Sequence, residues 1–308
     1  MPVISVVMPM RTMERYVEQA VRSVLAQHGV DLELVVVDDG STDGSTRVVR
    51  AIGDARVKLI DGPHTGIADA LNAGLAVATG EYFARCDSDD WYEPDRLLRQ
   101  LTFLHYTRAF DAVCGSYVHV TPAGKVIAHQ QGSDKSEEIT AELRKGIGRT
   151  HLCTFLVRMP VIRRLSGFRA FFIGTEDNDF QLRLGDIGRV WFEPTIAYRY
   201  RLHGESITHT QPSGQRKWLE AKAREFQLQR QSRGKDDLEL NQPPTMPGDF
   251  APVSTDTRHE MRDLLLGSAW KLHGLGKKKE AIRDGLRAVR VDAFSRQSWK
   301  SLLALVIK

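Results

Sequence analysis

Cysteine is rare in this sequence, and long apolar runs are absent from it. The three cysteines, Cys86, Cys114 and Cys153, are widely spaced and odd in number, so they suggest neither a zinc site nor a disulfide framework. A reducing compartment, the cytoplasm, fits this usage best. No apolar stretch reaches the roughly 20 residues that cross a bilayer. The N-terminus enters a β-prone run without a charged leader, which is unlike a signal peptide.

An excess of charge of one sign is also missing. The 43 Lys and Arg residues nearly balance the 39 Asp and Glu residues, so the net charge of +4 gives no electrostatic case for nucleic acid. Basic residues do not form a stripe interleaved with aromatic residues either. Apolar residues make up 42% of the chain, enough to bury one large core with an appendage. We therefore expect a globular protein without a nucleic-acid partner.

Apolar runs alternate with segments of helical apolar spacing along the first third of the chain. The runs predict strands, and the spaced segments predict helices. This alternation predicts an α/β fold with a Rossmann-like, mostly parallel sheet and helices on both faces. Pro9 is expected to end the first strand. The predicted strands are 3–8, 32–37, 57–60 and 82–86, and the predicted helices are 13–27, 45–52, 67–78 and 94–106.

Polar segments follow three of these strands at their carboxyl ends. They are residues 9–12, 38–41 and 87–90. Ligands of open α/β sheets bind outside the carboxyl ends of the strands. We therefore expect the three segments to meet at one edge of the sheet and to line a binding site.

The third of these segments is rich in carboxylates. In EYFARCDSDD, a β-prone run ends abruptly in Asp87, Asp89 and Asp90. Crowded carboxylates repel one another unless a cation lies among them. Mg²⁺ takes oxygen ligands, usually one or two carboxylates plus phosphate oxygens. The cluster therefore predicts a metal-held diphosphate, although solvated turn aspartates before a helix would give the same pattern.

The middle of the chain departs from the strand–helix alternation. A hairpin, a polar helical segment, a further strand and two short helices are expected there. The second of these helices begins with acidic residues near Thr175. In order, the elements are the hairpin at 112–120 and 124–129, the helical segment within 133–150, the strand at 151–158, the helix at 161–168 ending at Gly167, and the helix from about Thr175.

The C-terminal third changes in composition. Residues 213–236 predict a charged helix, residues 241–256 a Pro-rich linker, and residues 257–308 two or three helices. The segment AIRDGLRAVRV is amphipathic, with several Lys and Arg residues on or near its polar side. These helices are either a cap that packs through its apolar faces or a basic surface for anionic lipid. The basic residues are Lys277, Lys278, Lys279, Arg283, Arg287 and Arg290.

Five segments together resemble a known family. They are VVMPM…RYVEQAVRSVLAQ, ELVVVDDGSTDGS, GIADALNAGLAVATGEYFARCDSDD, TEDNDFQLRL and YRYRLHGESIT, in this order over about residues 3–210. The same order is seen in glycosyltransferase family 2, whose members have the GT-A fold and are inverting transferases that use nucleotide-diphosphate sugars. The form ALN…ARxDxDD is similar to the branch found among bacterial envelope and lipopolysaccharide glycosyltransferases.

The resemblance implies roles for residues on the donor side. It places Asp39 on the nucleotide base, where a carboxylate accepts the N3–H of uracil; an Asx turn is the structural alternative. Arg11, at a position where the family often has Tyr, would stack on the base or pair with a phosphate. Asp89 would bind Mn²⁺ or Mg²⁺ directly. The other implied donor-binding residues are Pro9, Asp38, Gly66, Asn72, Asp87, Ser88 and Arg201, and the other implied metal ligands are Asp87 and His203.

The resemblance also implies a catalytic pair on the acceptor side. Asp177 in TEDND matches the family's catalytic carboxylate and would take the acceptor's proton, while Glu176 would orient the acceptor. Alternatively, these acids only form a charged helix N-terminus, where the helix dipole favours them. His151 would either contact substrate or be a hydrogen-bonded structural histidine.

The resemblance thus implies a cytoplasmic transferase that acts by direct displacement with inversion. The donor would be a nucleotide-diphosphate sugar, with UDP favoured, and the acceptor a saccharide or lipid-linked saccharide. A sugar nucleotidyltransferase and a non-catalytic nucleotide-sugar-binding scaffold are the alternatives. Against the first, no Gly-rich, lysine-bearing loop lies near the N-terminus; against the second stand Asp87, Asp89 and Asp177.

The same interpretation divides the chain into three parts. Residues 1–212 would form the GT-A domain, with a nucleotide-sugar-binding half at 1–110 and an acceptor-side half at 111–212. Residues 213–256 would be a helix and linker, and residues 257–308 a helical extension. Peripheral contact with the inner face of the cell membrane would use the basic helices of that extension.

Overall fold

The structure is a computed structural model that describes residues 4–130, 133–204, 206, 211–248, 250, 257–274 and 276–307. Of the expected linker, residues 249 and 251–256 lie outside this part, as do residues 205, 207 and 208 of the fifth family motif. The chain forms two compact units. The first comprises Met1–Tyr117, Gln131–Tyr200 and Ser213–Ala251, and the second comprises Val118–Gln130, Arg201–Pro212 and Pro252–Lys308.

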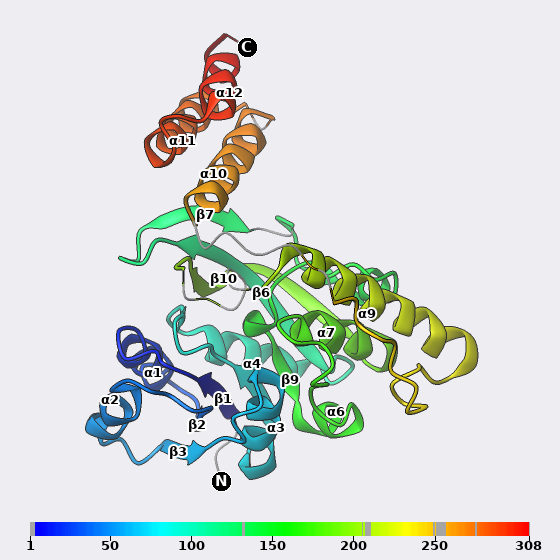
Figure 1. The fold of residues 1–308 in the computed structure, drawn as a ribbon. Coiled ribbons are helices and arrows are strands. Elements are labelled where there is room, and N and C mark those ends of the chain that lie inside the picture. Colours follow the sequence, from blue (N-terminus) through cyan, green and yellow to red (C-terminus); the bar gives the residue numbers. More distant parts are fainter. Residues whose placement is uncertain are drawn as a thin grey trace. The chain divides into compact units, whose positions relative to one another are not determined.

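Parallel strands form one half of the sheet in the first unit (Figure 1). Their order is β3-β2-β1-β4, and each neighbouring pair is parallel. The predicted α/β fold class is thereby confirmed. The strands are β1 (Ile4–Met10), β2 (Leu32–Asp38), β3 (Val57–Asp61) and β4 (Tyr82–Arg85); the helices between and after them are α1 (Val17–Leu25), α2 (Ser45–Ile52), α3 (Ile67–Val77) and α4 (Arg96–Tyr106).

Pro9 does not end β1, contrary to the prediction. The strand continues to Met10, with Pro9 in register with Val37 of β2. Backbone groups alternate in direction along a strand: the carbonyl of Val7 accepts a hydrogen bond from Cys86 after β4, whereas that of Met10 accepts one from Asp39 after β2. Pro9 therefore faces the β4 side, where strand pairing has already stopped at Val7, so its missing N–H removes no ladder bond.

Strands from the middle of the chain extend the sheet beyond β4. β9 lies between β4 and β6 and is antiparallel to both, and β10 is antiparallel to β5 and β8. The order continues as β4-β9-β6-β10-β5. These strands are β5 (Trp91–Tyr92), β6 (Ala112–Val120), β8 (Glu137–Glu138), β9 (Leu156–Arg158) and β10 (Val190–Arg201).

Two predictions for the middle region are wrong in part. Among the described residues of 133–150, only α5 (Thr140–Leu143) is α-helical, and Glu137 and Glu138 pair with β10 instead. The expected strand at 151–158 begins as the 3₁₀ turn η1 (Leu152–Thr154). The Thr154 hydroxyl donates to the His151 carbonyl (2.8 Å), a local bond that competes with strand pairing. The two short helices are confirmed as α6 (Met159–Arg164) and α7 (Glu176–Ile187).

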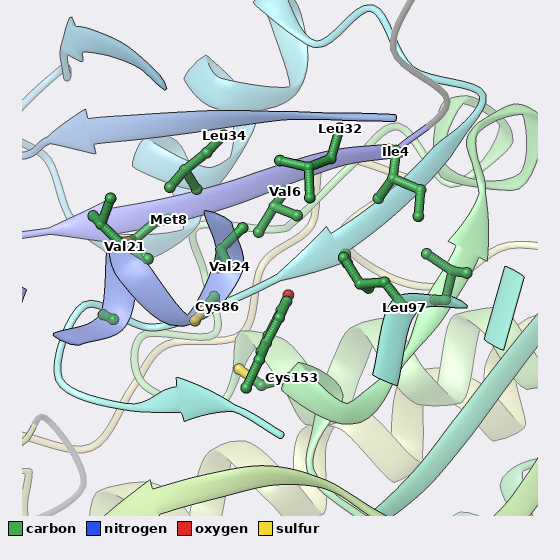
Figure 2. Packing of buried hydrophobic residues seen from close by; sticks show 14 of the residues in the cluster. Ile4, Val6, Met8, Val21, Val24, Leu32, Leu34, Cys86, Leu97 and Cys153 are labelled. Atoms are coloured by element: carbon green, nitrogen blue, oxygen red, sulfur yellow. The ribbon is translucent and has the colours of Figure 1, made fainter. Parts of the chain in front are cut away.

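Helices cover both faces of the sheet, as predicted. On β1, Ile4, Val6 and Met8 point to the face covered by α1 and α4, where Val21, Val24 and Leu97 pack against them (Figure 2). Val7 points to the opposite face, among residues of α3, α6 and α7. This alternation on two buried faces explains the continuous apolar sequence of β1.

A long helix, α9 (Ser213–Arg233), completes the first unit by packing against α7. Leu219 and Phe226 of α9 lie in one apolar cluster with Phe172 and Leu182. Gln227, 2% exposed, donates to the carbonyls of Leu143 (2.9 Å) and Leu182 (3.2 Å). The helix predicted at 213–236 is therefore part of the core around α7 rather than a solvated connection.

In the part that the structure describes, the second unit contains the rest of the hairpin and three helices. β7 (Val126–Gln130) pairs with β6, and α10 (Thr257–Gly274), α11 (Lys278–Val291) and α12 (Arg296–Ile307) follow. Ala269, Ala281 and Leu305 form their small apolar core. Within the described residues, no helix combines the length and the apolar character that a membrane span requires.

Glu33 joins four elements at the amino-terminal side of the sheet. Its carboxylate accepts hydrogen bonds from Ser5 (2.6 Å), Lys58 (2.5 Å) and the Thr79 backbone (2.6 Å). Burial raises the pKa of this carboxyl, but the bonds from Lys58, Ser5 and Thr79 outweigh burial and lower the pKa to about 2. Glu33 is thus bound as a carboxylate that the native state stabilises.

We expect Glu33→Gln to lower the free energy of unfolding by about 2 kcal/mol near neutral pH. Because the native pKa lies below the unfolded one, this contribution is fully present above about pH 4.5 and declines as the pH falls towards about 2. Urea unfolding of both proteins across this range measures it. The exposed Glu18→Gln is the control and should change stability by less than about 0.5 kcal/mol. A Glu33→Gln loss that stayed constant with pH would contradict the assignment.

Candidate active site

The loops after β1 and β2 are bound to each other. Thr12 donates its backbone N–H to Ser41 Oγ (2.9 Å), and Met13 donates to Ser45 Oγ (2.7 Å). Ser41 in turn donates its N–H to Asp38 Oδ1 (3.0 Å), so the side chain of Asp38 holds this loop. Two of the three predicted polar segments therefore meet, as expected from the ends of neighbouring parallel strands. Arg11, the first residue after β1, is exposed.

Asp39 is buried beside these loops and retains one unpaired oxygen. Its Oδ2 accepts the Gly66 N–H (3.0 Å), and its own N–H donates to the Met10 carbonyl (2.8 Å). Gly66 starts α3 with φ +116°, a conformation that favours glycine. Asp39 Oδ1 is buried without a hydrogen-bond partner among the described residues. A buried carboxylate oxygen without a donor is costly, and it is suited to accept an N–H from a ligand.

Asn72 has a structural partner for each end of its amide. Its Nδ2 donates to the Phe168 carbonyl (2.8 Å), and its Oδ1 accepts the Phe168 N–H (2.8 Å). The pair fixes α3 against the segment between α6 and α7. This geometry makes Asn72 a positioning residue, and a direct donor contact remains a prediction.

Arg85 at the end of β4 connects two of the predicted carboxylates. Its guanidinium donates to both oxygens of Asp87 (2.6 and 3.2 Å), and its Nη1 donates to Glu176 Oε1 (2.9 Å). Arg85 and Glu176 each have side chains that are 4% exposed. Because Glu176 is the first residue of α7, this ion-pair chain holds the start of α7 against the carboxyl end of β4.

The two carboxylates of this chain differ in their proton affinity. Burial raises the pKa of Asp87, but Arg85 and then His151 outweigh burial and keep the pKa below its ordinary value. Burial dominates at Glu176 and raises its pKa to about 7, although Arg85 opposes this. Glu176 Oε2 is buried and has no hydrogen-bond partner in the described part of the chain. Asp87 is therefore ionised at neutral pH, whereas Glu176 exchanges a proton near it.

The DSDD segment itself forms a tight turn. Asp87 donates its N–H to the Tyr198 hydroxyl (3.0 Å), and Asp90 donates its N–H to the Asp87 carbonyl (3.2 Å). Ser88 and Asp90 are buried, while Asp89 is partly exposed. Asp87 is partly exposed as well, and both of its oxygens accept hydrogen bonds from Arg85.

Side chains of α4 donate hydrogen bonds to the turn before β9. Arg96 is fully buried and donates to the carbonyls of Cys153 and Phe155 (2.9 Å to the latter). Gln100, one helical turn later, donates to the Thr154 carbonyl (2.7 Å). Three successive carbonyls of the turn are thus satisfied by side chains, which fixes the position of His151 at its start.

His151 lies beside the predicted base. Its Nδ1 accepts the Cys153 N–H (3.3 Å), which leaves Nε2 to carry the proton in the neutral ring, and Nε2 lies 3.7 Å from Asp177 Oδ2. The ring is stacked on Tyr198, with centroids 6.1 Å apart. Burial lowers the pKa of His151, although Asp177 and Asp87 oppose this, so the ring is neutral at neutral pH.

Three groups near this turn lie close enough together to share a metal ion. Asp87, His151 and Cys153 each place one ligand atom within 4.8 Å of the others. Such a mixed O, N and S set suits a softer ion than Mg²⁺. Arg85 also occupies both Asp87 oxygens, and burial raises the pKa of the Cys153 thiol well above its ordinary value. Asp87, His151 and Cys153 are therefore poorly suited to a hard ion that prefers oxygen ligands.

Arg201 and His203 belong to the second unit. Both are buried, and Arg201 Nη1 donates to the Pro122 carbonyl (2.5 Å) within that unit. Their roles towards phosphate and metal remain predictions. The structure brings Asp87, Glu176 and Asp177 near one another through residues to which the sequence analysis gave no role.

Those unassigned residues are Arg85, Arg96 and Cys153. Arg85 carried a weak signal, because a lone arginine stood inside a run that was otherwise apolar on both sides. Arg96 carried none, since a charged residue in the first turns of a helix is ordinarily solvated. A partner far along the sequence makes each of them a site residue, and such partners are not visible in local patterns.

Comparisons with known proteins show what this chain is similar to. The model of the family described as Glycosyl transferase family 2 matches residues 5–166. Chondroitin synthase of Pasteurella multocida (strain Pm70) is 30% identical over 209 residues, which are 67% of this chain and 21% of that protein. An uncharacterized glycosyltransferase of Haemophilus influenzae is 27% identical over 224 residues, covering 67% of this chain and 68% of that protein. The chain thus spans about a fifth of the length of the first of these relatives.

A solved structure extends the similarity over nearly the whole chain. That of S. aureus TarS 1-349 in complex with UDP-GlcNAc superposes with a TM-score of 0.62, covering 98% of this chain and 89% of the other. The two sequences are 17% identical, so this similarity concerns the fold.

We expect Arg85→Met to lower the free energy of unfolding by about 3 kcal/mol near pH 8, because it leaves the buried Glu176 and the partly exposed Asp87 without their cation. The loss should shrink towards about pH 5, where Glu176 and then Asp87 take up protons in the variant. Urea unfolding at both pH values measures it. The double variant Arg85→Met/Glu176→Gln should recover part of the loss. Equal losses for the single and double variants would show that Glu176 is not part of the chain of ion pairs.

Proposed function

Since this chain belongs to glycosyltransferase family 2, we propose that it transfers a sugar from a nucleotide-diphosphate sugar to a hydroxyl of a saccharide or lipid-linked saccharide, with inversion. The observation that carries the proposal is the chain of contacts Asp87–Arg85–Glu176, with His151 facing Asp177. It supports a single site made from the carboxyl end of β4 and the start of α7. A donor-binding turn and a candidate base then act on the same substrate.

The nucleotide is proposed to bind over the ends of β1 and β2. Asp39 Oδ1, the buried oxygen without a partner, would accept the N3–H of uracil. Pro9, Asp38 and Gly66 would shape this pocket, and exposed Arg11 would stack on the base or pair with a phosphate. The TarS structure similar in fold was solved with UDP-GlcNAc, which supports UDP as the nucleotide.

The diphosphate is proposed to bind with Mn²⁺ or Mg²⁺ at the DSDD turn. Asp89 would hold the ion directly and His203 would be a further ligand, Asp87 and Ser88 would contact the ribose or a bound water, and Arg201 would bind phosphate oxygens. A divalent ion at this place stabilises the negative charge on a departing nucleotide diphosphate. The partly exposed Asp89 and the ionised Asp87 have the oxygen ligands that such hard ions take.

Asp177 is proposed to be the general base. It would take the proton of the acceptor hydroxyl while that oxygen forms its bond to the anomeric carbon and the bond to the nucleotide diphosphate breaks on the opposite face. Asp177 is partly exposed, whereas its neighbour Glu176 is held by Arg85 inside the protein. Glu176 would therefore orient the start of α7 and the acceptor rather than accept the proton.

The wider setting is proposed from the relatives. Several of them are polysaccharide synthases or bacterial glycosyltransferases by name, which supports a role in bacterial envelope polysaccharide synthesis. We assign the transferase domain to residues 1–212, a helix and linker to 213–256, and a helical extension to 257–308. The cysteine usage supports a cytoplasmic location, at the membrane face where lipid-linked acceptors are elongated.

Asp177→Asn is expected to keep donor binding and to lower the rate of sugar transfer by about 10²–10⁴-fold, because it removes the proton acceptor and little else. Transfer from each nucleotide sugar to a panel of saccharides, with released nucleotide diphosphate as the readout, measures this rate. Glu176→Gln is the matched control and should be less impaired. Near-normal transfer by Asp177→Asn would remove it as the base, and release of pyrophosphate from a triphosphate would indicate a nucleotidyltransferase instead.

Asp89→Asn is expected to weaken Mn²⁺-dependent UDP binding by at least about tenfold, since a ligand oxygen loses its charge. Isothermal titration calorimetry with and without Mn²⁺ measures the difference. Asp39→Asn is the comparison: it should weaken UDP binding in both conditions, because its proposed contact is to the base. Unchanged Mn²⁺-linked affinity in Asp89→Asn would contradict its assignment as a metal ligand.

A further inference from the structure

Helix α12 has apolar side chains on its outer face. Trp299, Leu303, Val306 and Ile307 are 53, 61, 49 and 73% exposed. Their spacing places them on one face of the helix, because residues three, four, seven and eight positions apart lie together. Phe294, just before the helix, is 99% exposed. The outer face of α12 is therefore a continuous apolar stripe that ends near the last described residue.

The inner face of α12 is already packed. Leu302 and Leu305 are buried, and both lie against Gly285 of α11, where an added Cβ would come within 3.2 and 3.1 Å of their Cδ1 atoms. The outer stripe is therefore not the face through which α12 packs against α11. A surface helix with one packed face normally has polar residues on the other, and exposed apolar patches mark interaction sites.

Strong positive charge accompanies this stripe. Residues 277–308 contain nine Lys or Arg and three Asp or Glu, a net charge of +6, whereas the whole chain carries +4 and the remainder therefore −2. On α11, Lys279, Arg283 and Arg290 are exposed along one face. On α12, Arg296 and Lys300 are exposed beside the apolar stripe. The charge of the chain is thus concentrated where its apolar surface is exposed.

We propose that the outer face of α12 inserts into the headgroup region of an anionic lipid bilayer, with the basic residues of α11 and α12 binding the lipid phosphates. Apolar and aromatic side chains bordered by Lys and Arg are the composition of helices that lie in a membrane interface. Trp is enriched at that depth, because its ring is apolar and its N–H is polar. Each basic residue close to an anionic surface adds about 1 kcal/mol of attraction.

Other occupants fit the observations less well. A second copy of this chain would bring the same positive surface against itself, which is repulsive. A membrane-spanning arrangement would need roughly 20 residues, and α12 has 12. At about 1.5 Å per residue, α12 is about 18 Å long, a length that lies along a bilayer surface rather than across it.

The experiment is co-sedimentation of the full chain with vesicles of phosphatidylcholine alone and of phosphatidylcholine with phosphatidylglycerol. We expect binding to the anionic vesicles and weak binding to the neutral ones, with a fall in affinity at high salt. Trp299→Gln/Leu303→Gln should reduce the affinity by at least about tenfold. Lys279→Glu/Arg283→Glu should reduce it by at least about tenfold as well and remove the preference for anionic lipid.

A matched control is Leu228→Gln on α9, where another exposed leucine (65%) lies outside the apolar stripe of α12. It should bind vesicles like the unmodified chain, and thermal unfolding should confirm that all variants fold. Equal binding to both vesicle types, or unchanged binding of the α12 variant, would overturn the proposal. So would light scattering without lipid that showed a dimer converted to a monomer by the α12 variant. The outcome is independent of sugar transfer, because no donor or acceptor is present.

Discussion

The candidate site depends on one guanidinium. Arg85 is buried at the end of β4 and binds Asp87, two residues later, and Glu176, at the start of α7. The buried charges of Arg85 and Glu176 are tolerable only because each has a partner. The pairing also places the two adjacent acids, Glu176 and Asp177, in different environments. Glu176 is buried, whereas Asp177 is partly exposed and faces His151.

Much of the fold was predictable because its information is local. The apolar run of β1 and the helical spacing of α1 and α3 predicted their types, and the ends of the elements were wrong by only a few residues. The meeting of the loops after β1 and β2 followed from parallel topology alone. Pro9 was misjudged because whether a proline interrupts a strand depends on which neighbour its nitrogen faces, and that is a property of the sheet.

The acidic residues of the candidate site were predictable from the sequence, but the residues that hold them in place were not. Asp87, Glu176 and Asp177 were assigned from motifs, whereas Arg85, Arg96 and the contact of His151 with Asp177 depend on pairs separated by many residues. The region 133–158 was the least predictable part. Two contacts fix its short elements. Ile139 and Leu143 are buried in the core, and Arg96 donates to carbonyls of the turn that follows. Neither cause leaves a periodic pattern in the sequence.

The support of that turn by Arg96 and Gln100 has an evolutionary consequence. Hydrogen bonds to backbone carbonyls do not depend on which side chains the turn displays. Replacing His151 would remove its bond to the Cys153 N–H but leave the bonds from Arg96 and Gln100, so we expect the turn to keep its path. A turn supported in this way tolerates changes in the side chains that it displays while the framework that folds the protein stays the same.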